Sequence, residues 1–277
     1  MSLNPDFHFS QNNLQDYVDC PRRFELRHIQ HLEWPALQSE PVLLQEQLMV
    51  QGRQFHKMVQ QIMVGLPVET LIENVDSANL AQWWDNFMQS NPLIALPGKR
   101  YVEHYLSCPL AGYRLTAQYD LLAVEPGKRA VILDWKTSSR KPRREFLKNR
   151  LQTRVYRYML VEAGKQLNDN QPLLPEQVEM TYWFAEFPGE PEHFLYDQKQ
   201  FYEDRKFLTD LVVEIAHHES GQFILTPDEK KCLYCSYRSL CNRGEKAGNW
   251  ADQEEESETT RPLTVDLNFE QIGEVEF

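Results

Sequence analysis

Asp134 and Lys136 stand two positions apart at the end of an apolar run in the middle of the chain, in the order AVILDWK. In a β-strand this spacing places both side chains on one face. A carboxylate there can hold a divalent metal while the nearby ammonium meets an attacking water or a phosphate group. Strand ends also carry charged pairs that simply face water, so the tripeptide alone leaves both interpretations open.

A second carboxylate, Asp120, falls on the preceding apolar stretch, YRLTAQYDLLAV. The turn signal EPGKR between the two stretches predicts a hairpin. If its loop is centred on Gly127, Asp120 lies opposite Asp134, because the two are equally distant from that glycine. Two carboxylates on one face repel each other unless a cation lies between them. The hairpin therefore predicts a metal site.

Three further polar residues could complete such a site. Gln152 and Tyr156 are four positions apart on a predicted helix, so they project from one face. His56 lies upstream in GRQFHKMVQ, also on a predicted helix. A lone histidine among apolar neighbours is more often a structural residue than a ligand. Beside carboxylates, however, imidazole suits a Mg²⁺ or Mn²⁺ site with mixed ligands.

The rest of the chain must supply the elements that position these residues, and it predicts an α/β fold. Ser10 is expected to cap the first helix, and Pro21 to interrupt it. A three-strand meander is expected in the middle of the chain. Helices are expected over residues 10–20, 22–29, 41–64, 78–88, 144–164 and 200–218, and strands over residues 100–110, 113–124, 130–135, 179–187 and 193–196.

The motifs, taken in order, resemble the RecB-type branch of the PD-(D/E)XK nuclease superfamily. The segments that carry the resemblance are GRQFH, YRLTAQYD, ILDWKT and QTRVY. The resemblance implies that Mg²⁺ or Mn²⁺ is bound by His56, Asp120 and Asp134. It also implies a catalytic set of Asp120, Asp134, Lys136, Gln152 and Tyr156. The expected reaction is hydrolysis of phosphodiester bonds.

Three cysteines form a C-x₂-C-x₅-C cluster of Cys232, Cys235 and Cys241, a spacing that lets thiolates converge on one centre. Zinc is the generic expectation for such a cluster, once a fourth ligand is found. The segment DYVDCPRRFEL around Cys20 resembles the first-cysteine segment of iron–sulfur nucleases, which include CRISPR-associated RecB-like exonucleases and the AddB subunit. That resemblance implies a [4Fe–4S] cluster on these four cysteines. Cys108 fits neither set and is expected to be a small buried apolar residue.

The charge distribution indicates where nucleic acid could bind. A net charge of −12 argues at first against such a partner, since phosphate contacts favour basic surfaces. Residues 250–277 alone contribute −8, whereas residues 136–157 carry +8. The alternative for the basic segment is a solvated helix face. The residues predicted to bind nucleic acid are Arg140, Lys141, Arg143, Arg144, Lys148, Arg150 and Arg154.

The expected architecture is a restriction-endonuclease-like mixed central sheet flanked by helices, with the N- and C-terminal segments joined by the iron–sulfur cluster. A nuclease domain is expected over residues 1–249, with a helical insertion at about 35–97 and the cysteine cluster at 232–241. Residues 250–277 are expected to form an acidic, flexible tail. No apolar run is long enough to span a bilayer, and no secretory signal is recognisable, so a cytoplasmic protein is expected.

The function predicted from these features is that of a metal-dependent DNA nuclease, in particular an exonuclease, in DNA repair, recombination or CRISPR-type processing. Its substrate would be DNA that is single-stranded or has free ends. Because no helicase motif is present, a helicase or a CRISPR-associated protein is the expected partner. The alternative is an iron–sulfur or zinc DNA-binding or assembly subunit with a vestigial nuclease site.

Overall fold

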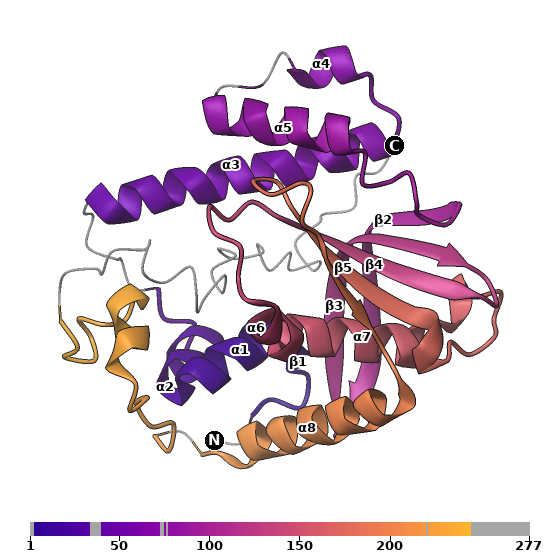
Figure 1. The fold of residues 1–277 in the computed structure, drawn as a ribbon. Helices are drawn as coiled ribbons and strands as arrows, with labels where there is room; N and C mark the ends of the chain where they lie inside the picture. Colours follow the sequence, from indigo (N-terminus) through magenta and orange to yellow (C-terminus); the bar gives the residue numbers. More distant parts are fainter. Residues whose placement is uncertain (1–2, 34–39, 73–74, 76, 220, 245–277) are drawn as a thin grey trace, which may run out of the picture.

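A mixed β-sheet forms the centre of the molecule (Figure 1). The computed structural model describes residues 3–33, 40–72, 75, 77–219 and 221–244. In this part of the chain the six strands are β1 (His8–Ser10), β2 (Lys99–Leu110), β3 (Tyr113–Glu125), β4 (Arg129–Lys136), β5 (Val178–Phe184) and β6 (Glu192–Leu195). The strand order is β1-β3-β4-β5-β6, and β2 also pairs with β3. The predicted tail at 250–277 lies outside the described residues.

Strand β3 changes its partner part-way along one edge. Its first half pairs in parallel with β1, up to Thr116, and its second half pairs antiparallel with β4 from Leu121. The other edge of β3 is lined by β2 along most of its length. Asp120 lies in the gap where β1 has ended and β4 has not yet joined. A split of this kind leaves room for side chains inside a sheet that is otherwise continuous.

The predicted meander and its register are confirmed. The pairs between β3 and β4 run from Leu121↔Leu133 to Glu125↔Arg129, and so are centred on Gly127. Gly127 has a φ of +76°, which a glycine adopts without strain. The ladder ends one position before Asp120 and Asp134, so the predicted pair of these two residues is not formed. Asp120 contacts His56 of α3, whereas Asp134 contacts Gln152 of α7, and the expectation that both carboxylates lie on one face of the sheet is wrong.

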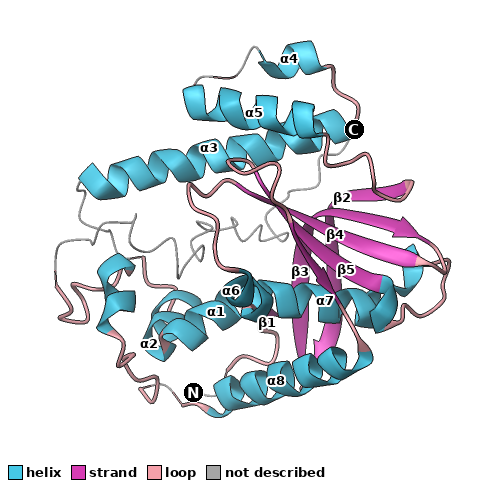
Figure 2. Cartoon of the chain, in the orientation of Figure 1, coloured by secondary structure: helices cyan, strands magenta, loops and turns pink. Residues whose placement is uncertain are grey.

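Helices cover both faces of the sheet (Figure 2). One face is covered by α1 (Gln11–Asp19), α7 (Leu151–Ala163) and α8 (Gln198–His217), and the other by α3 (Glu40–Met63) and α5 (Ala78–Ser90). The shorter helical elements are α2 (Pro21–Phe24), η1 (Glu25–Ile29), α4 (Val68–Ile72), α6 (Arg144–Asn149), η2 (Gly164–Leu167), η3 (Pro175–Gln177) and η4 (Glu229–Tyr234). The predicted mixed α/β fold, a central sheet flanked by helices, is confirmed.

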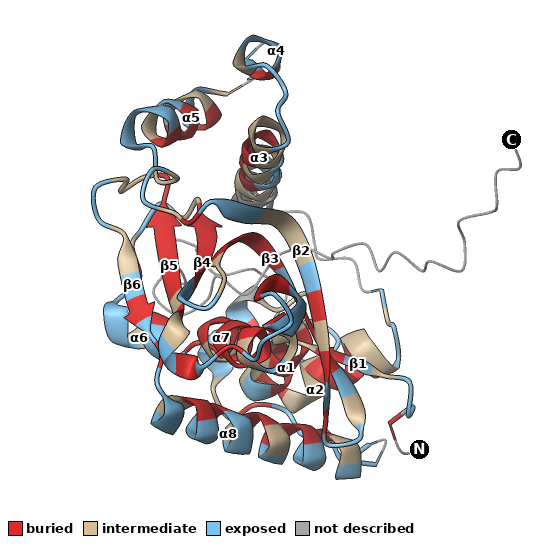
Figure 3. Ribbon diagram, turned by 90° about the vertical axis from the view of Figure 1, so that its right-hand side faces the viewer, coloured by how far each residue is buried: buried red, intermediate tan, exposed pale blue. Residues whose placement is uncertain are grey.

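The central strands are buried on both sides, as Figure 3 shows for β3, β4 and β5. Ile132 packs into the core beneath α7 and α8, whereas its neighbours Leu133 and Trp135 belong to the core beneath α3 and α5. This alternation explains why the sequence of β4 is an unbroken apolar run up to Asp134. A strand buried on both faces needs apolar residues at every position.

The single helix predicted over residues 144–164 is wrong in one respect, because it breaks at Arg150. That residue has an extended backbone, with φ −60° and ψ 143°, and separates α6 from α7. The Thr153 hydroxyl donates to the Leu147 carbonyl at 2.5 Å and so spans the break. The break places Gln152 in the first turn of α7, where it faces the end of β4.

Other elements were not predicted from the sequence. Strand β1 and helix α4 were missed, and the short helix expected after Pro21 continues as a π-helical segment, η1. The Ser10 cap is confirmed, because its side chain accepts a hydrogen bond from the Asn13 backbone. No helix in the described part of the chain is long and apolar enough to cross a membrane.

Candidate active site

Asp120 is held in the sheet split by contacts to two other elements. Its Oδ1 lies 3.3 Å from Nδ1 of His56, which projects from α3. Its Oδ2 accepts a 3.0 Å hydrogen bond from the backbone N–H of Trp135 on β4. The carboxylate therefore binds the strand that diverges from β3, and it joins helix α3 to the sheet. The structure thus brings together the predicted His56 and Asp120.

Asp134, Lys136 and Gln152 form a second, connected group. The Lys136 ammonium lies 2.9 Å from Oδ2 of Asp134. The Gln152 amide donates to Oδ1 of Asp134 at 2.7 Å and accepts from Lys136 Nζ at 3.1 Å. Asp134 is fully buried, so its charge needs these partners. The structure places the three predicted residues in mutual contact, as the strand period and the helix spacing predict.

An aromatic cluster supports the site from the side of α3. Trp135, the residue between Asp134 and Lys136, packs against Trp183 of β5 with ring centroids 5.8 Å apart. Phe55, which precedes His56, stacks on Trp183 with an interplanar angle of 12°. Large rings with fixed rotamers restrict the motion of the backbone that carries them. The cluster therefore fixes both α3, which carries His56, and the end of β4.

Gly52 is a site residue that the sequence analysis missed. A Cβ at this position of α3 would lie 2.8 Å from the Thr137 hydroxyl, immediately after Lys136. Only a residue without a side chain lets the helix approach the end of β4 so closely. The available signal was a glycine inside the helical motif GRQFH, since glycine in a helix interior is unfavourable unless packing needs it.

Glu103 marks an irregularity in β2 beside Asp120. It has a φ of +48°, and the β2–β3 ladder has no pair at this position, although Val102↔Leu121 and His104↔Tyr119 flank it. The alternation of β3 shifts at the same point, because Tyr119 and Leu122 both face one core. Asp120 and the next residue therefore both face α3. Nothing in the amino-acid pattern predicts this shift.

Tyr156 occupies a different environment from the other predicted catalytic residues. Its ring lies 4.8 Å from that of Tyr119, and its carbonyl accepts a 2.9 Å hydrogen bond from the Tyr119 hydroxyl. Only 2% of its surface is exposed, within the core beneath α7. These contacts support α7 against β3, so Tyr156 has a structural role whatever its part in catalysis.

Three of the predicted nucleic-acid-binding cations are paired with acidic residues. Lys141 lies 2.8 Å from Glu192, and Arg144 lies 2.6 Å from the same carboxylate. Arg154 bonds Asp204 of α8. A phosphate would have to compete with these carboxylates, whose charges cancel much of the predicted positive segment. The sequence could not show this, because the acids come from β6 and α8.

The remaining basic residues of that segment differ from one another. Arg150 is buried, with its guanidinium 5.8 Å from the Phe146 ring. Arg140, Arg143 and Lys148 are exposed. The prediction of a uniform basic face is therefore replaced by a few separate exposed cations.

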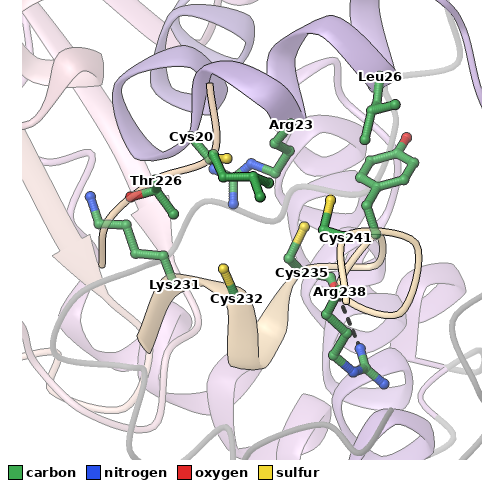
Figure 4. A pocket seen from close by; sticks show the side chains of 11 residues that line it. Cys20, Arg23, Leu26, Thr226, Lys231, Cys232, Cys235, Arg238 and Cys241 are labelled. Carbon is green, nitrogen blue, oxygen red and sulfur yellow. Dashed lines mark hydrogen bonds between the residues drawn. The ribbon is translucent and has the colours of Figure 1, made fainter. Parts of the chain in front are cut away.

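The four cysteines expected to act together line one small cavity (Figure 4). Cys20 reaches it from the N-terminal segment, while Cys232, Cys235 and Cys241 come from the C-terminal segment, and Figure 4 shows their sulfur atoms directed towards a common space. Burial raises the pKa of Cys235, and the charge of nearby Arg23 acts in the opposite direction.

Cations and carboxylates join the two segments around this cavity. Arg23, Lys231 and Arg238 also line it. Asp19 binds both Arg23 at 2.6 Å and Lys231 at 3.2 Å, so it joins α1 to the cysteine segment. Burial also raises the pKa of Cys232 and of Cys241, and the charge of nearby Arg243 acts in the opposite direction on both.

Cys108 lies apart from this cavity. It is buried on β2 in the core beneath α7, and burial with the nearby Glu162 raises its pKa to about 12. Among the described residues, no three or more His, Cys, Asp or Glu side chains are already arranged as ligands of a metal ion. Both candidate centres are therefore identified by their donor types and proximity.

Comparison with known proteins places the chain in a family. The model of the PD-(D/E)XK nuclease superfamily matches residues 8–242. No curated protein matches the chain. A crystal structure from Eubacterium rectale, of a protein named "Putative exonuclease", has a TM-score of 0.50 at 10% identity, covering 80% of this chain and 85% of that one. The structure of SSO0001 gives a TM-score of 0.37 at 12% identity, covering 87% of each chain.

At such identities the first of these structures shows a shared fold alone. The family model, in contrast, matches residues 8–242, a range within which the His56–Asp120 pair, the Asp134–Lys136–Gln152 group and the four cavity cysteines all lie. The protein belongs to the PD-(D/E)XK nuclease superfamily.

Proposed function

We propose that this protein is a metal-dependent DNA nuclease, acting as an exonuclease on phosphodiester bonds. The observation that carries the proposal is the bridge made by Gln152, which holds Asp134 and Lys136 together in a buried site. A structural charge pair at a strand end would face water. Here three polar groups are taken out of water at the strand end where Asp120 accepts the backbone N–H of Trp135. Such an arrangement is costly for folding unless it serves chemistry.

The donor set suits a hard divalent cation. Two buried carboxylates, Asp120 and Asp134, come from neighbouring strands, and the His56 imidazole lies beside one of them. Oxygen ligands with one imidazole suit Mg²⁺ or Mn²⁺. When bound, such an ion supplies Lewis-acid polarisation of the phosphate and activation of water. His56, Asp120 and Asp134 would hold it.

The other residues would act on charge and orientation. Lys136 places a positive group where negative charge develops on the phosphate. Gln152 is a positioning residue, because it fixes both the Lys136 ammonium and the Asp134 carboxylate. Tyr156 would contribute by holding α7, which carries Gln152, against β3. In this proposal Lys136 stabilises the charge on the phosphate, and α7 holds Gln152 in the position that orients Lys136 and Asp134.

We further propose that Cys20, Cys232, Cys235 and Cys241 bind a [4Fe–4S] cluster, which would place the chain in the RecB-like iron–sulfur branch. The convergence of both chain segments on one cavity supports this assignment. Zinc on the same four ligands is the alternative. In either case the metal would fasten the N- and C-terminal segments to each other, with Asp19 and its cations supporting the same junction.

The substrate proposed is DNA that is single-stranded or carries free ends, in repair, recombination or CRISPR-type processing. A helicase or CRISPR-associated protein would supply such ends. Residues 1–249 would form the nuclease domain, with α3, α4 and α5 as its helical insertion. The family match and the buried polar group support this function.

One set of digestions tests the proposal. The purified full chain is incubated with end-labelled linear DNA and with closed circular DNA, each single- and double-stranded, in Mg²⁺, Mn²⁺ or EDTA. We expect metal-dependent shortening of linear substrates and protection of closed circles. Binding of DNA without cleavage under every metal condition would contradict the proposal and indicate a DNA-binding subunit instead.

A further inference from the structure

We infer that the DNA strand reaches the site along the flank of α3 and is bound by Arg53 and Arg140, not by the basic face of α6 and α7. This inference rests on the proposed nuclease function, which it makes more specific. Arg53 lies outside the basic segment predicted to bind nucleic acid, and Arg140 lies at the N-terminal edge of that segment. It also separates these two cations from neighbours that are paired with acids.

The first step concerns where the site opens. The Asp134 side chain is 1% exposed and Asp120 3%, whereas Lys136 reaches 10% and His56 21%. His56, which projects from α3, is therefore the most exposed of these four side chains. We therefore expect a phosphate to approach the site past His56.

The second step places Arg53 at this opening. Residues three or four apart on a helix are neighbours, so Gly52 and Arg53 each lie about one turn before His56 on α3, with Arg53 turned away from the buried side that carries Gly52. Gly52 contacts Thr137 at the end of β4, and His56 contacts Asp120. Arg53 lies on the flank beyond these two contacts and is exposed. Its guanidinium is therefore next to the site but outside the core.

The third step places Arg140 across the same opening. It lies three residues after Thr137, in the connection from β4 to α6. The close approach of Thr137 to Gly52 brings the start of this connection beside α3, and Figure 1 shows the connection leaving the sheet below that helix. Arg140 is exposed, and in the described part of the chain neither it nor Arg53 forms an ion pair. Arg53 and Arg140 are thus exposed cations on the two segments that meet where Gly52 approaches Thr137.

The fourth step compares the two routes. On the α6–α7 face, a phosphate that binds Lys141 or Arg144 would have to displace Glu192, and one that binds Arg154 would have to displace Asp204. At the α3 entrance no such exchange is needed. Guanidinium groups bind phosphate with two parallel hydrogen bonds, which favours arginine at such a position. The entrance formed by Arg53 and Arg140 is the electrostatically favoured path.

The test measures binding without cleavage. Fluorescence anisotropy of a labelled single-stranded oligonucleotide is recorded with the full chain in EDTA over a range of salt concentrations. The variant is Arg53→Gln with Arg140→Gln, and the matched control is Lys141→Gln with Arg144→Gln, which changes the net charge equally. Thermal unfolding of both variants confirms that they fold.

Each phosphate contact to a single strand contributes roughly 0.7 to the slope of log K against log salt. We expect the Arg53/Arg140 variant to lose about 1.4 from that slope and at least tenfold in affinity, and the control to keep the parental slope. The inference would be overturned if only the control variant lost affinity, if both variants lost it equally, or if neither changed. It would also be overturned if the parental chain showed no salt-dependent binding. Cleavage of DNA by the parental chain is measured separately. If the Arg53/Arg140 variant loses affinity as expected but the parental chain does not cleave DNA, only the nuclease proposal is contradicted.

Discussion

The Gln152 amide donates a 2.7 Å hydrogen bond to Asp134, and so joins the first turn of α7 to the end of β4. Its carbonyl accepts from Lys136 at 3.1 Å, which means that one side chain orients both charged residues of the D-x-K motif. The position of Gln152 depends on the helix break at Arg150. The site is therefore assembled by a helix start and a strand end, and the opposite face of that strand end packs against the aromatic cluster through Trp135.

Replacement of this bridge should reduce the rate without abolishing it. In Gln152→Ala, Lys136 and Asp134 keep their ion pair but lose their common support, so we expect the single-turnover cleavage rate to fall by roughly 10- to 100-fold. Gln177→Ala is the control, because Gln177 bonds the Gly127 carbonyl at the far end of the hairpin. A parental rate in Gln152→Ala would show that the bridge has no part in catalysis.

Gly52→Ala should destabilise the fold by crowding α3 against Thr137. The added Cβ meets the Thr137 hydroxyl at 2.8 Å, and overpacking of this kind costs about 1–3 kcal/mol, which outweighs the gain of up to about 1 kcal/mol in helix propensity. Urea unfolding measures the change in the free energy of unfolding. The double variant Gly52→Ala with Thr137→Ala removes the clash and should recover most of the loss. If the single variant were as stable as the parent, the close approach would have no energetic importance.

Each of the four cavity cysteines should be needed for metal. Replacement of Cys20, Cys232, Cys235 or Cys241 by Ser should lower the iron and sulfide content of anaerobically purified protein, bleach its brown absorbance and lower its melting temperature. The thermal effect follows from the long loop that the metal closes between Cys20 and Cys232. Cys108→Ser is the control and should keep full metal content. Stoichiometric zinc without iron or sulfide in the parental protein would show that the cluster assignment is wrong.

Cys108 should be chemically inert in the folded protein. Burial, together with the charge of Glu162, raises its pKa to about 12, so the thiol is almost entirely protonated at pH 8. Alkylation requires the thiolate, and access to this thiol is also blocked. We expect iodoacetamide at pH 8 to leave Cys108 unmodified in the native chain and to modify it after unfolding in urea, as read by mass spectrometry. Rapid native labelling would contradict the assigned burial.

The parts of the site that could be predicted from the sequence are those set by local periodicity. The hairpin register followed from Gly127, and the contact of Asp134 with Lys136 followed from the strand period. The shared helix face explains why Gln152 reaches them. Each of these depends on residues close together in the chain.

The parts that could not be predicted depend on contacts between distant segments. The neutralisation of Lys141 and Arg144 requires Glu192, which comes from another strand. The partner change along β3 and the shift beside Glu103 are properties of the assembled sheet. Gly52 acquires its importance only because α3 packs on the end of β4.

The most direct test of the proposed site is the cleavage rate of Asp134→Ala beside that of the parental chain, on 5′-labelled linear single-stranded DNA in Mn²⁺. Asp134 is fully buried at the centre of the polar group, and its loss removes both a proposed metal ligand and the partner of Lys136 and Gln152. A folded Asp134→Ala variant, with parental metal content at its cysteines, should cleave slower by roughly a thousandfold or more. Cleavage by this variant at the parental rate would show that phosphodiester hydrolysis, if present, takes place elsewhere.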